Sequence, residues 1–525
     1  MKKYTFPLFL LGFIAFTHAQ QPVVEWAKTY GGSDVEYPAD ILLTADNKYI
    51  IAGSTNSKDF DVTQNRGGED VWVVKLDEDG KILWQKTYGG TGNEGATSIK
   101  QTKDGGYMLL GVTSSKDGDF IANKGSTDIF LSKLDAQGNI LWTKIYGGSS
   151  NDYPSSFFET TTGELVMSVS SKSKDLDFPL NYGDYDMWVL KLSSKGDIIW
   201  KKHIGGTSYD FAEEVIQVDN YSYLLVGFTG STDSDMVDHK GFITSKRDTW
   251  IKIDTFGQVL WHKTYGFEPI GFFTGIVAVK SDSTGFIAVG GCSIAGNYSV
   301  EHDDADIFVS KLDRNGNLMW RKVIGGLGGE AAHDVEVLAD GSYAILSATN
   351  SKVSGDITAS YGGGSDYWVI RLDSKGEKIL WQLALGGSGF DNCETRGMIV
   401  TKDNKIVIVG ETSSVDGTFS KMKGEYDWGI VKLKNIGLPT HSFEAKTLKA
   451  IKIYPNPASN YLNIENNEAE ILAYELLNVN GQIVQKGQLS NGNQTIYFHI
   501  PDGFYLMNLT KNKNLLASKK LIINF

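Results

Sequence analysis

The segment "ILWQKTYGG" (residues 82–90) has the composition of a β-strand that ends in a pair of glycines. Near copies follow as "ILWTKIYGG" (140–148), "IIWKKHIGG" (198–206) and "ILWQLALGG" (379–387). The tryptophan of this strand occurs seven times at intervals of 58 to 61 residues, as Trp26, Trp84, Trp142, Trp200, Trp261, Trp320 and Trp381. A period of this length is typical of a repeat architecture and not of unrelated domains.

A second landmark of the repeat is an aspartate that opens a strand such as "DVWVVKLD" (70–77). It also occurs seven times, as Asp70, Asp128, Asp186, Asp248, Asp306, Asp366 and Asp427. One full repeat contains four short apolar segments, "ATSIKQT" (96–102), "YMLLGVTSS" (107–115), "DIFLSKLD" (128–135) and "NILWTKIYGG" (139–148). Because four antiparallel strands per repeat form one blade of a β-propeller, the sequence predicts seven blades.

The two ends of the repeat region complement each other. The region begins with a strand of the Trp type, "VVEWAKTYGG" (23–32), and ends after a strand of the Asp type, "EYDWGIVKLK" (425–434). We therefore predict that the Trp26 strand joins the sheet of Asp427 and closes the ring without free edges. The predicted fold is all-β, with a seven-bladed β-propeller (22–434) closed by its N-terminal strand, a linker (435–449) and a small C-terminal β-sandwich (450–525).

The repeated tryptophan has a structural explanation. Strand alternation places Ile82, Trp84, Lys86 and Tyr88 on one face, where large side chains can fill the space between neighbouring sheets. Stacking on carbohydrate is the alternative role. One identical tryptophan per repeat favours core packing.

Charge and export signals limit the functional classes. The net charge of -13 repels phosphate backbones, so nucleic acid is not an expected partner. "MKKYTFPLFLLGFIAFTHAQ" has two lysines, a short apolar run and Ala19, which predicts a signal peptide over residues 1–19. No later stretch is apolar enough to predict a transmembrane segment in the mature chain. Cys292 and Cys393 lie far apart in different repeats and are expected to be free buried thiols.

The C-terminal segment has its own pattern. It contains Tyr454, Pro455, Asn456, Pro457 and Ser459, then Gly481 in "YELLNVNGQIV", Gly503 and Tyr505 in "GFYLMNLT", and a last strand "ASKKLIINF". This ordered set resembles the type A C-terminal sorting domain of the type IX secretion system of certain Gram-negative bacteria. The resemblance implies export to the periplasm, recognition by the type IX machinery, and a secreted or surface-attached protein.

Catalytic motifs are absent from the sequence. "GTGNEG" (90–95) has the spacing of a dinucleotide-binding loop, but a strand and not a helix is expected after it. G-x-S-x-G, H-E-x-x-H and paired C-x-x-C patterns do not occur, and the eight histidines are scattered. No catalytic residue is therefore assigned.

Two acidic patterns recur in the predicted loops. Six of the seven crossovers carry an acid at one register, Glu36, Glu94, Asp152, Asp210, Glu330 and Asp391. Asp-x-Asp pairs occur at Asp59 and Asp61, Asp117 and Asp119, Asp175 and Asp177, and Asp233 and Asp235. Oxygen ligands of this kind suit calcium, which makes the first two pairs candidate metal ligands and calcium the only cofactor considered. Capping of the loop backbone is the favoured interpretation, because each pair supplies only two carboxylates.

Departures from the repeat mark the candidate ligand site. The crossover "YGFEPIGFFTG" (265–275) lacks the acid, and the loops "STDSDMVDHKGFITSKRD" (231–248) and "NYSVEHDDAD" (297–306) are also irregular. The candidate ligand-binding residues are Phe272, Phe273, His239, Tyr298, His302 and Asp303. Simple loop degeneracy is the alternative explanation.

Two functions fit these observations. The first is an exported, non-enzymatic binding module for a glycan or a protein ligand. The second is a secreted hydrolase or lyase that acts on an external polymer with carboxylates at the propeller mouth. Because the acids are repeated, whereas enzymes usually use unique convergent groups, binding is favoured over catalysis.

Overall fold

The computed structural model describes residues 21–236, 247–266, 272–293 and 305–437, together with most of the strands between residues 451 and 523. Contacts within the chain divide it into two compact units, Met1–Leu438 and Pro439–Phe525. The predicted signal peptide and linker lie outside the described residues, apart from residues 435–437. None of the described segments forms an apolar helix long enough to cross a bilayer.

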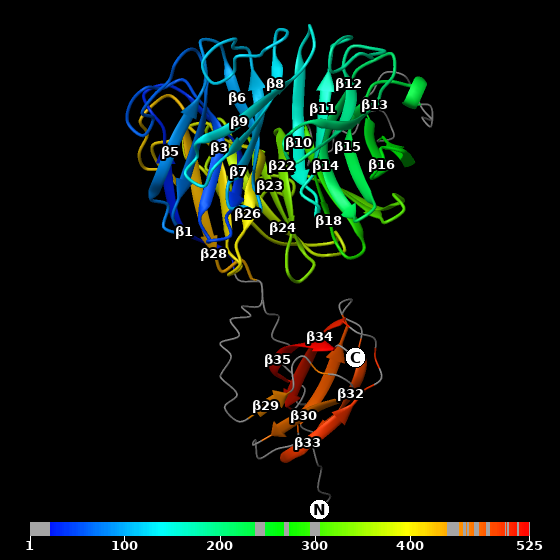
Figure 1. The fold of residues 1–525 in the computed structure, drawn as a ribbon. Coiled ribbons are helices and arrows are strands. Elements are labelled where there is room, and N and C mark those ends of the chain that lie inside the picture. The colour runs from blue at the N-terminus through cyan, green and yellow to red at the C-terminus, as the bar shows by residue number, and fades with distance from the viewer. Residues whose placement is uncertain are drawn as a thin grey trace, which may run out of the picture. The chain divides into compact units, whose positions relative to one another are not determined.

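The first unit consists of seven four-stranded antiparallel sheets, and Figure 1 shows them side by side in a β-propeller-like arrangement. The first three sheets comprise β2 (Glu36–Leu43), β3 (Tyr49–Thr55), β4 (Asp70–Leu76) and β5 (Ile82–Tyr88); β6 (Glu94–Gln101), β7 (Tyr107–Thr113), β8 (Asp128–Leu134) and β9 (Ile140–Tyr146); and β10 (Asp152–Glu159), β11 (Leu165–Ser171), β12 (Asp186–Leu192) and β13 (Ile198–Ile204). The next three comprise β14 (Asp210–Asp219), β15 (Ser222–Thr229), β16 (Arg247–Asp254) and β17 (Val259–Tyr265); β18 (Phe272–Ser281), β19 (Gly285–Ser293), β20 (Asp306–Asp313) and β21 (Leu318–Ile324); and β22 (Glu330–Val337), β23 (Tyr343–Thr349), β24 (Asp366–Leu372) and β25 (Ile379–Leu385). A single 3-10 turn, η1 (Ser234–Met236), interrupts the described loops.

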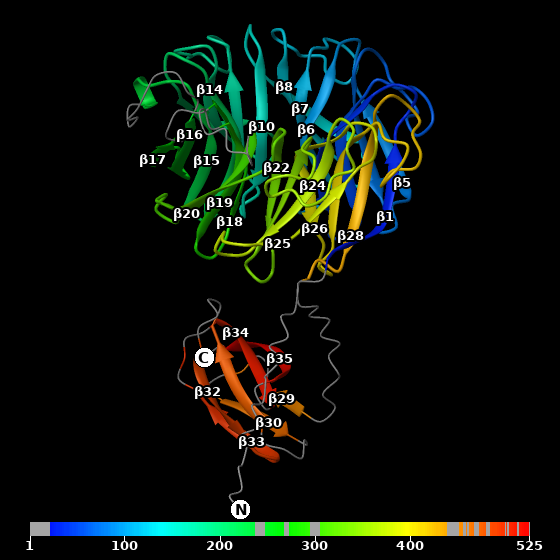
Figure 2. The same ribbon diagram turned by 180° about the vertical axis from the view of Figure 1, so that it is seen from behind.

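The seventh sheet combines the two ends of the unit. It contains β26 (Asp391–Val400), β27 (Ile406–Thr412), β28 (Asp427–Lys434) and the N-terminal strand β1 (Val23–Tyr30). β1 pairs antiparallel with β28, so that Trp26 lies opposite Lys432 and Tyr30 opposite Trp428. Figures 1 and 2 both show β1 beside β28. The predicted pairing of the Trp26 strand with the sheet of Asp427 is therefore confirmed.

The repeated Trp strand connects each sheet to the next. The β8–β9 turn of the second sheet contains Gly138, which has a φ of 79° and contacts the ring of Trp84 so closely that a Cβ there would lie 3.0 Å from it. The Tyr88 hydroxyl donates a hydrogen bond of 2.5 Å to the carbonyl of Gly138. The strand is therefore repeated because it recognises the glycine turn of the following sheet. Packing between sheets was the predicted role of Trp84, whose ring is half-buried.

The same contacts occur where the first and seventh sheets meet. Trp26 and Tyr30 contact Gly80 in the β4–β5 turn, and the indole nitrogen of Trp26 donates a bond of 3.3 Å to the carbonyl of Glu78. Trp72 and Trp428 are fully buried in one hydrophobic cluster, with ring centroids 4.2 Å apart. The interface between the ends of the repeat region is thus built like the others.

Two smaller expectations are also met. Cys292 and Cys393 are free and buried. "GTGNEG" leads from β5 directly into β6, so it does not open a helix and lacks the geometry of a dinucleotide-binding loop.

The second unit has two antiparallel sheets around its own core. One contains β29 (Ile451–Tyr454), β30 (Tyr461–Asn466) and β33 (Gly492–Tyr497), and the other contains β31 (Leu472–Leu477), β32 (Ile483–Leu489), β34 (Gly503–Lys511) and β35 (Asn514–Ile523). Their apolar faces share a cluster that includes Ile464, Leu476, Tyr505 and Leu521. Two sheets with a common core are what the predicted small sandwich requires.

Candidate functional site

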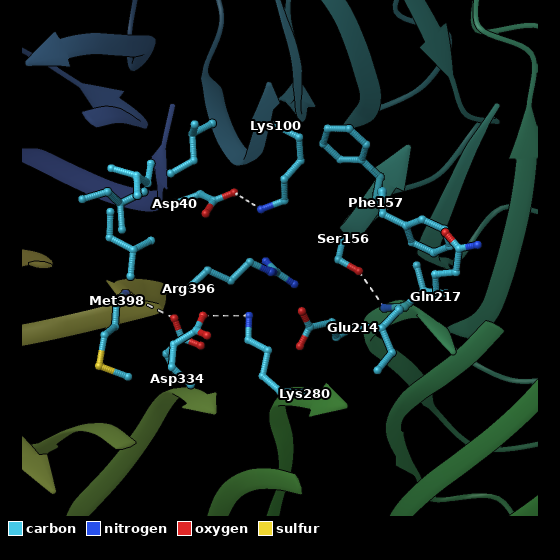
Figure 3. Close-up of a pocket in the computed structure, with 18 of the residues that line it drawn as sticks. Asp40, Lys100, Ser156, Phe157, Glu214, Gln217, Lys280, Asp334, Arg396 and Met398 are labelled. Atoms are coloured by element: carbon cyan, nitrogen blue, oxygen red, sulfur yellow. Dashed lines mark hydrogen bonds and ion pairs between the residues drawn. The ribbon is translucent and has the colours of Figure 1, made fainter. Parts of the chain in front are cut away.

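The innermost strands of the seven sheets line a central cavity. It has a volume of about 440 Å³ and is bordered by residues from β2, β6, β10, β14, β18, β22 and β26. Figure 3 shows acidic and basic side chains from several sheets pointing into this space. Lys100 pairs with Asp40 at 2.9 Å, and Lys280 pairs with Glu336 at 3.1 Å. The cavity is therefore polar, but most of its charges are compensated.

Some of the carboxylates in the cavity connect neighbouring sheets by hydrogen bonds. Each innermost strand has an irregular register after its third or second residue, which re-aims the residues that follow. As a result Asp40 in β2 accepts a bond of 2.9 Å from the backbone of Ile99 in the next sheet. Glu214 accepts a bond of 2.7 Å from the backbone of Val279 in the same way. These carboxylates have a structural use, which makes them poor candidates for catalysis.

The charges in the cavity influence one another. Burial opposes the positive charge of Lys280, but the carboxylates of Glu336 and Asp334 outweigh it and raise the pKa of the lysine. Burial raises the pKa of Asp334, and Lys280 partly offsets this effect. Lys280 therefore remains protonated and supplies the counter-charge for the acids around it.

Arg396 separates this cavity from a second one nearer the crossover loops. It lines both the 440 Å³ cavity and a neighbouring cavity of about 290 Å³. Its side chain comes from β26 of the seventh sheet, and its guanidinium donates a bond of 3.0 Å to the backbone carbonyl of Glu213 in the fourth sheet. The residue is only 9% exposed. It thus crosses the centre of the unit.

Aromatic side chains border the cavity on the crossover side of Arg396. Tyr153 and Phe211 line the 290 Å³ cavity, and Tyr37 and Tyr153 line an adjoining depression of about 570 Å³. Each is the second residue of its innermost strand. Tyr37 and Tyr153 are 40% and 37% exposed. We call this region the axial mouth, defined by Tyr37, Tyr153, Phe211 and Arg396.

The mouth aromatics are held by further rings. Tyr185 lies 6.0 Å from Tyr153 and 4.8 Å from Phe211, measured between ring centroids. Phe211 stacks on Phe228 at 5.2 Å. Because these neighbours fix the ring planes, Tyr153 and Phe211 form a preorganised apolar wall beside polar backbone and hydroxyl groups.

The six repeated crossover acids do not lie free at this mouth. In each case a carboxylate oxygen accepts a bond of 2.8 or 2.9 Å from the second glycine of the preceding crossover. Each acid also accepts a hydrogen bond from a threonine or serine hydroxyl of the adjacent strand. All six side chains are buried. Turn capping, and not a ligand at the mouth, engages these acids.

This burial has a measurable consequence for stability. Burial raises the pKa of Asp152 to about 6, in spite of its hydrogen bonds to Ser171 and Gly148. A carboxyl group whose pKa is raised by folding stabilises the fold while it is protonated, and this contribution is lost as the pH rises through the folded pKa. Burial also raises the pKa of Glu36, Asp210, Glu330 and Asp391.

We therefore expect the first unit to melt at a higher temperature at pH 5 than at pH 8. Asp152→Asn should reduce the difference in unfolding free energy between these pH values by on the order of 1 kcal/mol. Chemical denaturation at both pH values measures this effect. Asp197→Asn is the control. A hydrogen bond and the charge of Lys144 lower the pKa of this exposed aspartate, so it is ionised at both pH 5 and pH 8. An unchanged difference in Asp152→Asn would contradict the expectation.

The Asp-x-Asp pairs are likewise tied to the crossovers. Asp59 accepts a bond of 2.8 Å from the backbone of Ser33, and Asp117 accepts one of the same length from Thr91. Asp61 is paired with Lys423, and Asp119 with Arg66. Within the described ranges no group of three or more His, Cys, Asp or Glu side chains could hold a metal ion. These contacts agree with the capping interpretation, and calcium binding stays an untested expectation.

The predicted ligand residues are only partly described. Phe272 and Phe273 do not lie in the crossover loop but begin β18, where their backbones pair with Ser293 and Cys292. Phe273 takes the register of the crossover acid, because it pairs with Cys292 opposite Asp306, just as Glu36 pairs with Thr55 opposite Asp70. His239, Tyr298, His302 and Asp303 lie outside the described residues. In this sheet the position of the mouth aromatics is taken by Gly275, which pairs with Gly291, so the register does not relate Phe272 or Phe273 to them.

Sequence reasoning missed Arg396, although a signal was present. In β26 the pairing passes from Cys393 opposite Gly410 to Met398 opposite Ile408, so three extra residues are inserted on this strand. The bulge of β2 inserts one extra residue, so the insertion in β26 is two residues longer. Aligning "DNCETRGMIV" with "EYPADILL" shows the same excess. The irregular register accompanies a φ of 61° at Arg396.

Together the fold and the tail define an exported protein with a β-propeller-like repeat unit and a small C-terminal sandwich. Residues 452–524 match the family model of the secretion system C-terminal sorting domain. The second unit is therefore a type IX sorting domain, the protein interacts with the type IX secretion machinery, and it is secreted or attached to the cell surface. Of the sorting motif, Tyr454, Gly503 and Tyr505 lie in strands, whereas Pro455, Asn456, Pro457 and Gly481 lie outside the described residues.

The chain is also similar to other known proteins at low sequence identity. Regulatory protein FlaEY of Caulobacter vibrioides is 23% identical over 406 residues, which cover 74% of this chain and 39% of that protein. The chain thus spans less than half the length of this relative. The plexin A4 extracellular region is 9% identical, covers 94% of this chain and 62% of its own, and has a TM-score of 0.43. The Synechocystis apocarotenoid oxygenase is 10% identical, with coverages of 79% and 94% and a TM-score of 0.37.

Proposed function

We propose that the first unit is a closed seven-bladed β-propeller that binds a glycan at the axial mouth after type IX export. The observation that carries the proposal is the pair of half-exposed tyrosines, Tyr37 and Tyr153, beside Phe211 over the 290 and 570 Å³ hollows. Aromatic faces stack on sugar rings, and polar side chains that border the wider hollow, such as that of Glu69, can bond sugar hydroxyls. The adjoining hollows offer room for more than one sugar.

The alternative of a hydrolase or lyase needs carboxylates that reach a substrate at the mouth. The repeated acids are buried in hydrogen bonds with crossover glycines, and Asp40 and Glu214 bond neighbouring sheets. Their engagement favours binding over catalysis. A protein ligand remains the competing class, and the same binding experiment distinguishes it.

Tyr153→Ala should weaken glycan binding about ten-fold or more with little change in the melting temperature. The reason is that the ring loses its stacking partner at the mouth while its exposed side contributes little to packing. The full exported chain is first tested on a glycan array, and the strongest glycan is then titrated by calorimetry.

Tyr221→Ala provides the matched control, because Tyr221 is 78% exposed in the β14–β15 turn, at the opposite end of the strands. Phe273→Ala extends the test to the candidate residue that takes the register of the crossover acids in the fifth sheet. Retention of full affinity by Tyr153→Ala would move the glycan site elsewhere. If the chain binds a surface protein and no glycan, the ligand class is protein and not glycan.

A further inference from the structure

Arg396 is a buried cation with an unusual position. The irregular register of β26 and a φ of 61° direct it across the centre of the unit, where it contacts the carbonyl of Glu213. Figure 3 shows its side chain extended into the cavity between Lys100, Ser156 and Lys280. A non-glycine residue with this φ is uncommon and is typical of functional positions.

The guanidinium lacks a counter-ion among the described residues. Lys100 and Lys280 have ion-pair partners, Asp40 and Glu336, whereas the bond that the structure gives to Arg396 is to a neutral carbonyl. Burying a charge is costly unless the charge is paired, and a guanidinium has five donors in a planar fork that matches a carboxylate. An anionic group in the adjoining 290 Å³ cavity would complete this site.

The walls of that cavity indicate what carries the anion. Tyr153 and Phe211 offer apolar faces, and Thr97, Ser155 and Glu213 add polar groups to the wall. The Ser155 hydroxyl donates a bond of 2.5 Å to the carbonyl of Ala212, and its oxygen can accept a bond from a sugar hydroxyl. A sugar ring presents both an apolar face and hydroxyl groups. The net charge of the chain, -13, disfavours polyanions, so a single carboxylate is a better match than a highly charged polymer.

We propose that Arg396 binds the carboxylate of a hexuronic acid residue of the glycan, with the sugar ring against Tyr153 and Phe211. This inference rests on the proposed glycan-binding function and specifies its ligand class. Arg396 selects the acidic sugar, and the aromatic wall binds the ring whether or not it carries a charge.

The test compares two probes with the same ring, methyl β-D-glucuronide and methyl β-D-glucoside. Both are titrated by NMR into the full exported chain, and the glucuronide is expected to bind about ten-fold more tightly or better, as a charge-assisted bidentate contact would give. Arg396→Gln should bring the two affinities to within about two-fold of each other, and Arg396→Lys should retain part of the preference. Tyr153→Ala should weaken both probes together.

The comparison of the two probes on the unaltered protein can overturn the proposal by itself. The test therefore remains valid if Arg396→Gln does not fold. Equal affinity for the two probes, or binding of a neutral glycan from the array without binding of the glucuronide, would overturn the role of Arg396 and leave the mouth as a glycan site. A preference that survives in Arg396→Gln would also overturn it. Binding of a peptide with a free C-terminal carboxylate, without any binding of the glucuronide, would overturn the sugar assignment.

Discussion

Removal of residues 20–32 is expected to lower the melting temperature of the first unit by on the order of 10 °C or more. These residues include β1, which supplies the outer strand of the seventh sheet by pairing with β28. They also supply Trp26 and Tyr30, which contact the glycine turn of the first sheet. Without them the edge of β28 is unpaired and the first and seventh sheets lose their shared contacts. Differential scanning calorimetry of the full and shortened chains measures the change.

A pair of single substitutions sharpens this prediction. Trp26 and Trp84 make equivalent contacts with Gly80 and Gly138, so Trp26→Ala and Trp84→Ala should destabilise the unit by similar amounts, about 2 to 4 kcal/mol. The lower end reflects the half-buried state of both rings. If β1 pairs with the seventh sheet without stabilising the unit, Trp84→Ala will lower the melting temperature, whereas Trp26→Ala and the truncation will leave it unchanged.

The sheets could be predicted because each repeat encodes them in full. The Trp strand and the Asp strand recur with a nearly constant spacing, and each performs a task that any neighbouring pair of sheets requires. Trp84 packs on Gly138, and Asp70 accepts a bond of 2.8 Å from the backbone of Arg66. Such contacts lie within one sheet or between two consecutive sheets, so the repeated sequence is enough to deduce the sheets.

The mouth was harder to predict because it depends on how separate repeats combine. Tyr37, Tyr153 and Phe211 are far apart in the sequence and become neighbours of one hollow only when the innermost strands surround the centre. The bulge in each strand decides which side chains point inward, and its position is not visible in the alternation of residues. The acids were conspicuous in the sequence because they recur, and their repetition reflects turn capping.

Arg396 illustrates the same limit. Its importance comes from the carbonyl of Glu213, which lies three sheets away along the chain, and from the lack of a counter-ion among the described residues. The two additional residues of "DNCETRGMIV" could have drawn attention to this strand. Only the structure relates their position to the centre of the unit.

Removal of residues 450–525 is expected to abolish secretion and leave a folded first unit in the periplasm of a bacterium that has the type IX machinery. The removed segment contains the whole sorting domain, matched over residues 452–524. It has its own hydrophobic core, as does the first unit, whose clusters contain no residue of the sorting domain. The deletion should therefore change the destination of the protein and not the fold of the repeat unit.

Cell fractionation and protection from external protease measure where the shortened chain accumulates, and the melting curve of the periplasmic material reports its fold. As a reciprocal control, residues 439–525 are fused to a periplasmic reporter that has its own signal peptide. Since a sorting domain is an address read by the secretion machinery, the reporter should reach the surface or the medium. Surface display of the shortened chain, together with a reporter that stays in the periplasm, would mean that the first unit itself carries the export information.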